Sequence, residues 1–109
     1  MTDQQNDGIA EYFEAAASQL ARVLEMQRPA MEAVAQLWTD VILNDKLIYS
    51  FGSGHSRFIA GELYWRAGGL APVMMIEDPT KGSAERLEGY AGLFMQEYAI
   101  TAGDVIVVI

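Results

Sequence analysis

The segment Gly52-Ser53-Gly54-His55-Ser56 combines residue types that suit the binding of an anion. Glycines let backbone N–H groups approach a ligand closely, because no Cβ stands in the way. The hydroxyls of Ser53 and Ser56 can donate to phosphate oxygens, and His55 is the only imidazole in the chain. We therefore predict that Gly52, Ser53, Gly54, His55 and Ser56 bind an anionic substrate, and that His55 can also act as a catalytic acid or base.

Three kinds of phosphate-binding loop are worth comparing with this segment. A P-loop requires Lys-Ser or Lys-Thr after its second glycine, and the chain has no such pair. A dinucleotide-binding loop requires a small residue at position 57, where Arg57 stands, although Glu77 after the next strand resembles its ribose-binding acid. A serine-containing loop that holds a small phosphate group, such as that of a sugar phosphate, fits best. Ser56 or His55 can alternatively act only as a helix cap.

Hydrophobic spacing predicts the elements that position this loop. Apolar residues recur at helical spacing from Ile9, after a possible N-cap at Asp7, and Pro29 predicts a break or kink that separates two N-terminal helices. Short apolar runs then alternate with helical patterns, which is typical of a parallel sheet covered on both faces. The expected strands are 46–51, 73–76 and 105–109, and the expected helices are 9–28, 31–42, 56–66 and 87–98.

Composition excludes several classes of function. The net charge of −8, with only seven basic residues, argues against a nucleic acid partner. No apolar run is long enough to suggest a membrane span. One histidine and dispersed carboxylates predict no metal site, and we expect no cofactor. The absence of cysteine is compatible with the cytoplasm, which is the location we expect.

Three blocks in the same order resemble the SIS (sugar isomerase) domain superfamily. The resemblance is closest to an incompletely characterised bacterial family of SIS-domain proteins and more distant to phosphoheptose isomerase. The blocks are Ile48-Tyr49-Ser50-Phe51-Gly52-Ser53-Gly54-His55-Ser56, then Glu62-Leu63 with Arg66-Ala67-Gly68-Gly69-Leu70-Ala71-Pro72-Val73, and then Glu85-Arg86-Leu87-Glu88-Gly89-Tyr90-Ala91 before Gly103-Asp104-Val105.

The resemblance implies a three-layer, flavodoxin-like α/β fold that binds phosphorylated sugars. It implies that residues 1–45 form a helical segment for assembly into a homodimer or homotetramer, and that residues 46–109 form the first half of an SIS domain. Members of the superfamily carry a second serine-rich loop after the third strand, where this chain ends. We therefore expect the chain to be an N-terminal fragment whose C-terminal part is missing.

Glu62 enters as a catalytic candidate through the same resemblance. In phosphoheptose isomerase a glutamate on the helix after the first loop takes part in proton transfer, and Glu62 is the nearest match. Glu62 is about one helical turn closer to the loop than the glutamate of phosphoheptose isomerase is. It therefore lies on a comparable face of the helix but not at an equivalent position. An ion pair with Arg66, four residues later, is an alternative role for Glu62.

Two functional hypotheses follow from the loop and the resemblance. The first is an aldose–ketose isomerase of a sugar phosphate, with Glu62 or His55 moving the proton. The second is a non-catalytic phosphosugar sensor or regulatory binding module, which needs the loop but neither base.

Overall fold

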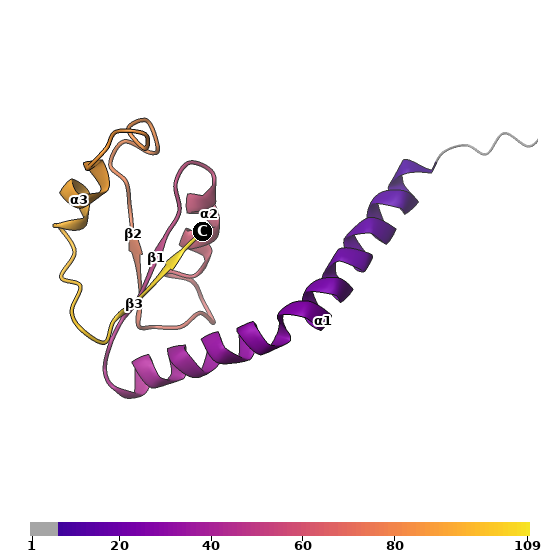
Figure 1. The fold of residues 1–109 in the computed structure, drawn as a ribbon, viewed down its shortest axis with the longest axis horizontal. Helices are drawn as coiled ribbons and strands as arrows, with labels where there is room; N and C mark the ends of the chain where they lie inside the picture. The colour runs from indigo at the N-terminus through magenta and orange to yellow at the C-terminus, as the bar shows by residue number, and fades with distance from the viewer. Residues whose placement is uncertain (1–6) are drawn as a thin grey trace, which may run out of the picture. The chain divides into compact units, whose positions relative to one another are not determined.

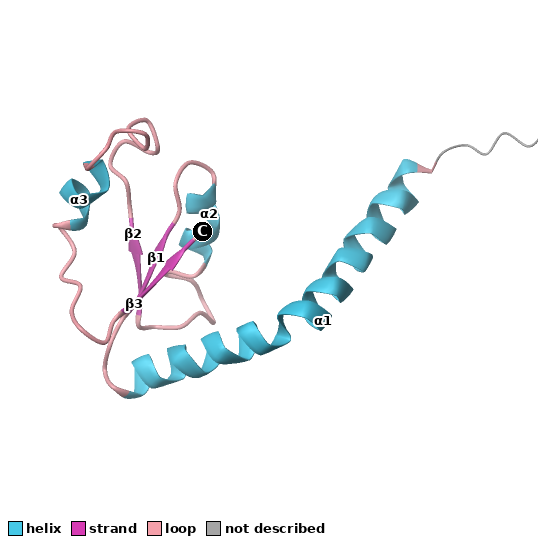
Figure 2. Cartoon of the chain, in the orientation of Figure 1, coloured by secondary structure: helices cyan, strands magenta, loops and turns pink. Residues whose placement is uncertain are grey.

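The computed structural model describes residues 7–109, which form three helices and three strands (Figure 2). Their order follows the alternation expected from the sequence. The helices are α1 (Gly8–Leu43), α2 (Ser56–Glu62) and α3 (Tyr90–Met95), and the strands are β1 (Ile48–Phe51), β2 (Val73–Ile76) and β3 (Val105–Val108).

The structure joins the two expected N-terminal helices into the single helix α1. Asp7 caps its start as predicted, since its carboxylate accepts a hydrogen bond of 3.2 Å from the Ala10 N–H. Pro29 lies inside the helix, where it lacks the N–H that would bond the carbonyl four residues earlier. An exposed ion pair of 3.6 Å between Arg28 and Glu32 spans this position. One missing bond is therefore tolerated within a long run of intact helical bonds on either side.

The strands form a parallel sheet in the order β2-β1-β3, which confirms the predicted fold class. Ile48 stands beside both Val73 and Val105, so the three strands begin in register. From the central β1 the chain goes to β2 on one flank and then crosses to β3 on the other. Such a reversal of strand order opens a crevice at the carboxyl ends of the strands, where ligands of flavodoxin-like folds bind.

Helices cover the two faces of the sheet and complete three layers (Figure 1). On one face, Ile48 and Val73 pack with Val41 from the last turns of α1, and the Ser50 hydroxyl donates to the Ala60 carbonyl of α2 at 2.8 Å. On the other face, Tyr49 and Ile76 pack against Phe94 of α3, as part of a second core cluster. Strand residues that alternate along β1 therefore face opposite layers.

Two helices are shorter than their spacing predicted. The chain leaves α2 before Arg66, because Trp65 takes a left-handed conformation with a φ of 49°. Gly89, with a φ of 78°, precedes α3, so residues 87–89 lie in turns instead of the helix that we expected there. In both cases a local reversal of the backbone overrides an apolar spacing that continues beyond it.

The chain divides into two compact units, residues 1–36 and residues 37–109. The second unit contains the sheet, both core clusters and the predicted anion-binding loop. No helix within residues 7–109 is both long and apolar enough to cross a membrane.

Candidate functional site

The predicted anion-binding loop follows β1 directly and turns into α2. Gly52 is buried, and a Cβ at this position would lie 2.4 Å from the backbone carbonyl carbon and oxygen of Ser56. Gly54 has a φ of 56°, a conformation that glycine adopts without strain. The two glycines thus allow the tight reversal from strand to helix that the sequence suggested.

Backbone hydrogen bonds close this reversal and determine which amides remain for a ligand. The Ser56 N–H donates to the Ser53 carbonyl at 3.1 Å, and the Arg57 N–H donates to the Gly54 carbonyl at 3.4 Å. None of the hydrogen bonds described for residues 7–109 uses an N–H of the segment from Gly52 to His55. These amides are the backbone donors that the loop can offer to an anion.

A carboxylate already contacts the loop. The Ser53 hydroxyl donates a short hydrogen bond to Oε2 of Glu85, which comes from the turns between β2 and α3. The same segment packs closely on the loop, since a Cβ at Gly82 would lie 3.2 Å from the Gly54 nitrogen and 3.4 Å from the Glu85 carboxylate. An anionic ligand that uses Ser53 must therefore displace Glu85.

His55 occupies the N-cap position of α2, but its side chain makes no capping hydrogen bond. The exposed imidazole stacks on Phe58, with ring centroids 6.0 Å apart and an angle of 27° between the rings. It therefore lies in the loop without a polar partner among the described residues.

Glu62 lies at the far end of α2, about 9 Å along the helix axis from Ser56. Its carboxylate forms an exposed ion pair of 2.8 Å with Arg66, which is the alternative role that the sequence suggested. The structure brings Ser53, His55 and Ser56 together in the loop, but it does not bring Glu62 to them.

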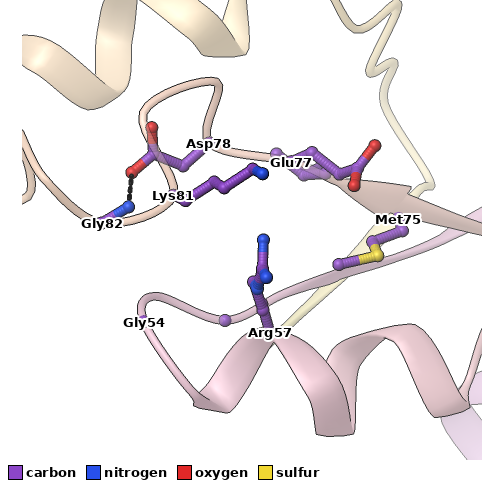
Figure 3. A pocket seen from close by; sticks show the side chains of 9 residues that line it. Gly54, Arg57, Met75, Glu77, Asp78, Lys81 and Gly82 are labelled. Carbon is purple, nitrogen blue, oxygen red and sulfur yellow. Dashed lines mark hydrogen bonds between the residues drawn. The ribbon is translucent and has the colours of Figure 1, made fainter.

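A cavity of about 20 Å³ lies between the loop and the turn after β2 (Figure 3). This volume holds roughly one water molecule. Its lining includes Gly52 and Gly54 from the loop, Arg57 from α2, and Asp78 and Lys81 from the turn. Figure 3 shows Arg57 extending from α2 and Lys81 extending from the turn into the gap between these two segments.

Asp78 organises the turn that carries Lys81. Its carboxylate accepts hydrogen bonds from the N–H and hydroxyl of Thr80, both at 2.8 Å, from the Gly82 N–H at 2.9 Å and from the Tyr90 hydroxyl at 2.9 Å. Burial alone would raise the pKa of Asp78, but these hydrogen bonds outweigh it and hold the pKa below its ordinary value. Asp78 is therefore an ionised structural anchor.

Sequence reasoning named neither Lys81 nor Glu85 as a candidate site residue. Both belong to the segment of turns after β2. The available signal was the cluster of breaker residues from Pro79 to Gly82, since a turn after a parallel strand lies at the same sheet edge as the loop after β1. The contact between Ser53 and Glu85 had no signal in the sequence.

Comparison with known families identifies the class of this protein. Residues 11–109 match the SIS domain family. Because the match covers nearly the whole chain, the chain belongs to the SIS-domain family.

The curated relatives are named UPF0309 proteins. The chain is 39% identical over 99 residues to one from Halalkalibacterium halodurans, and this alignment covers 83% of the chain and 41% of the relative. It is 36% identical over 107 residues to those of Brucella ovis and Brucella canis, covering 90% of the chain and 44% of each relative. The chain therefore spans less than half the length of the relatives it matches, and their names state no activity.

Proposed function

We propose that this chain forms part of a phosphosugar-binding site in which the Gly52–Ser56 loop holds the phosphate. One observation carries the proposal: in a chain of the SIS-domain family, a glycine–serine loop follows the central strand β1 at the edge where the strand order reverses. The free amides of the loop from Gly52 to His55 and the serine hydroxyls are the donors for phosphate oxygens.

We propose aldose–ketose isomerisation as the reaction. A base removes the proton from the carbon next to the aldehyde while the carbonyl oxygen gains a proton, which gives an enediol. The hydroxyl on the second carbon then loses its proton, and the first carbon gains one to yield the ketose. His55 and Glu62 are the candidate bases, and the position of His55 beside the loop supports it better than that of Glu62.

A sensor or regulatory binding module is the second candidate function. The observation that favours it is the position of Glu62, which lies about 9 Å along α2 from Ser56 and forms an exposed ion pair with Arg66. Binding of a phosphosugar without turnover needs only the loop.

Binding is tested by ligand-detected NMR with glucose 6-phosphate and glucose. We expect millimolar binding of glucose 6-phosphate and no binding of glucose, because the phosphate provides most of the contacts. Equal binding of the two sugars, or binding of neither, would contradict the proposed function.

Catalysis is tested by His55→Asn and Glu62→Gln, with Glu97→Gln as a matched control at an exposed position after α3. Interconversion of the hexose phosphates by the unsubstituted protein, lost in either variant while affinity is kept, supports the isomerase. Binding without any interconversion supports the sensor. The control should behave like the unsubstituted protein in both measurements.

We propose that two or four copies of the chain assemble through α1. Apolar side chains along this helix are exposed, with exposed fractions of 75% for Ile9, 72% for Tyr12 and 71% for Leu20. A second copy that packs on these side chains would bury them. The division into an assembly segment at 1–45 and half a domain at 46–109, and the cytoplasmic location, stay predictions.

A further inference from the structure

Two cations converge on the cavity beside the anion-binding loop from separate parts of the fold. Arg57 comes from the first turn of α2, and Lys81 comes from the turn after β2. Figure 3 shows both side chains extending into the gap between the loop and the turn. Like charges that line one small cavity repel each other unless an anion lies between them.

The carboxylates around the cavity do not bridge these cations. Asp78 accepts three hydrogen bonds from the turn and one from Tyr90 of α3, and Glu85 accepts from Ser53. The Glu77 carboxylate points away from both charged groups in Figure 3. The two ion pairs described between residues 7 and 109 are Arg28 with Glu32 and Arg66 with Glu62, so neither Arg57 nor Lys81 takes part in one.

The placement is notable in a chain with a net charge of −8. Only seven residues are Lys or Arg, and two of them line this one small cavity beside Gly52 and Gly54. The flat guanidinium fork and the compact ammonium are both good partners for phosphate oxygens.

The contacts of Ser53 and Gly54 indicate how a phosphate would enter. The Ser53 hydroxyl donates to Glu85, and Gly82, on the same turn as Lys81, packs against Gly54. A phosphate that accepts from Ser53 therefore requires this turn to withdraw from the loop. The withdrawal also releases Ser53 from Glu85, which lies further along the same segment.

We infer that Arg57 and Lys81 bind the dianionic phosphate of the sugar phosphate, and that the turn carrying Lys81 exchanges Glu85 for this phosphate at Ser53. The inference rests on the proposed function and adds the residues that select the charge of the ligand. Lys81 and Arg57 attract the dianion, whereas Glu85 competes with it.

The test measures affinity for inorganic phosphate and for glucose 6-phosphate by calorimetry in Lys81→Gln, Arg57→Gln and Glu85→Gln. We expect the first two variants to weaken both affinities about fivefold or more and the third to strengthen them about threefold. Lys46→Gln is the matched control, since Lys46 precedes β1 at the opposite end of the strands, and it should change neither affinity more than twofold. Lys81→Arg should keep the affinity, which separates loss of charge from loss of folding.

A pH series gives a readout that a structural role would not change. The second pKa of a phosphate monoester is about 6, so a site that selects the dianion should bind glucose 6-phosphate more tightly as the pH rises from 5.5 to 7.5. This increase should be smaller in Lys81→Gln.

The outcomes separate the inference from the proposed function. If the unsubstituted protein binds glucose 6-phosphate and neither Lys81→Gln nor Arg57→Gln changes the affinity, the inference is overturned and the proposed function is kept. Charge-dependent binding of inorganic phosphate without binding of glucose 6-phosphate would support the inference and contradict the proposed function. If the unsubstituted protein binds neither inorganic phosphate nor glucose 6-phosphate, the inference and the proposed function are both overturned.

Discussion

Gly52 and Ser53 show how single residues of the loop depend on their surroundings. Position 52 requires glycine because the Cβ of any other residue would clash with the backbone of Ser56. Ser53 presents its hydroxyl as expected, but a carboxylate from the same chain accepts its hydrogen bond. The carboxylate of Glu85 therefore already contacts the loop that we propose as the anion site.

Substitution of Gly52 by alanine should destabilise the chain. The added Cβ would meet backbone atoms of Ser56 at 2.4 Å and the Arg57 nitrogen at 2.8 Å, which cannot move without displacing the start of α2. We expect the free energy of unfolding, measured with urea, to fall by about 2 kcal/mol or more.

Gly61→Ala is the control for this substitution. Gly61 lies within α2, and its nearest contact to a new Cβ would be the Met75 sulfur at an ordinary 3.7 Å. Alanine should stabilise this helix position by about 0.5–1 kcal/mol relative to glycine. Equal effects of the two substitutions would show that close packing does not explain the glycine at position 52.

At the scale of elements, Asp104 joins the turn before β3 to the start of β1. Its carboxylate accepts from the Leu47 N–H at 2.9 Å and from the Thr101 N–H at 2.8 Å. These hydrogen bonds, with smaller help from the Thr101 hydroxyl and the charge of Lys46, lower the pKa of Asp104 below its ordinary value, although burial acts in the opposite direction. The ionised form is therefore favoured in the folded chain.

This lowered pKa predicts how the stability changes with pH. The stabilisation from Asp104 is fully present above its unfolded-state pKa of about 4, and it is lost as the pH falls through the lower pKa of the folded state. Asp104→Asn should therefore lower the midpoint of urea unfolding at pH 7, and the difference from the unsubstituted chain should shrink toward pH 3.

Asp45→Asn is the matched control for the pH series. Asp45 is exposed and has a φ of 55°, a conformation that asparagine also tolerates. Its substitution removes the same charge without these hydrogen bonds, so the midpoint should change little at either pH. A difference for Asp104→Asn that persists undiminished at pH 3 would refute the assigned role of its ionised form.

The elements also show where spacing along the sequence stops being informative. Parallel strands and their order of appearance were predicted from short apolar runs, because burial on both faces selects such residues. The end of α2 and the start of α3 were not predicted correctly, because Trp65 and Gly89 reverse the backbone where the apolar spacing continues. Pro29 was expected to divide α1, but the helix continues through it.

At the scale of the whole molecule, the exposed apolar residues of α1 predict assembly. Leu20 and Leu24 lie one helical turn apart, with exposed fractions of 71% and 53%. Leu20→Glu with Leu24→Glu should lower the mass measured by light scattering to that of one chain, because charges would be buried in the contact.

Ser18→Glu provides the comparison for the assembly experiment. Ser18 is exposed on the same helix, roughly 160° around the axis from Leu20. This variant should keep the mass of the unsubstituted protein. A monomeric unsubstituted chain, or an unchanged mass in the double variant, would rule against assembly through this side of α1.

The sequence by itself determined the parallel α/β fold, the position of the anion-binding loop and the family resemblance. These properties depend on local spacing and on residues that are neighbours along the chain. Only the tertiary structure decided that Glu85 reaches Ser53, 32 residues earlier, and that Lys81 and Arg57 line the same cavity. The physical reason is that such contacts depend on how far each turn carries the chain across the sheet edge, and residue spacing does not record that distance. The sequence predicted a loop that is free to bind an anion. In the folded chain Glu85 accepts a hydrogen bond from this loop, and Arg57 and Lys81 lie beside it.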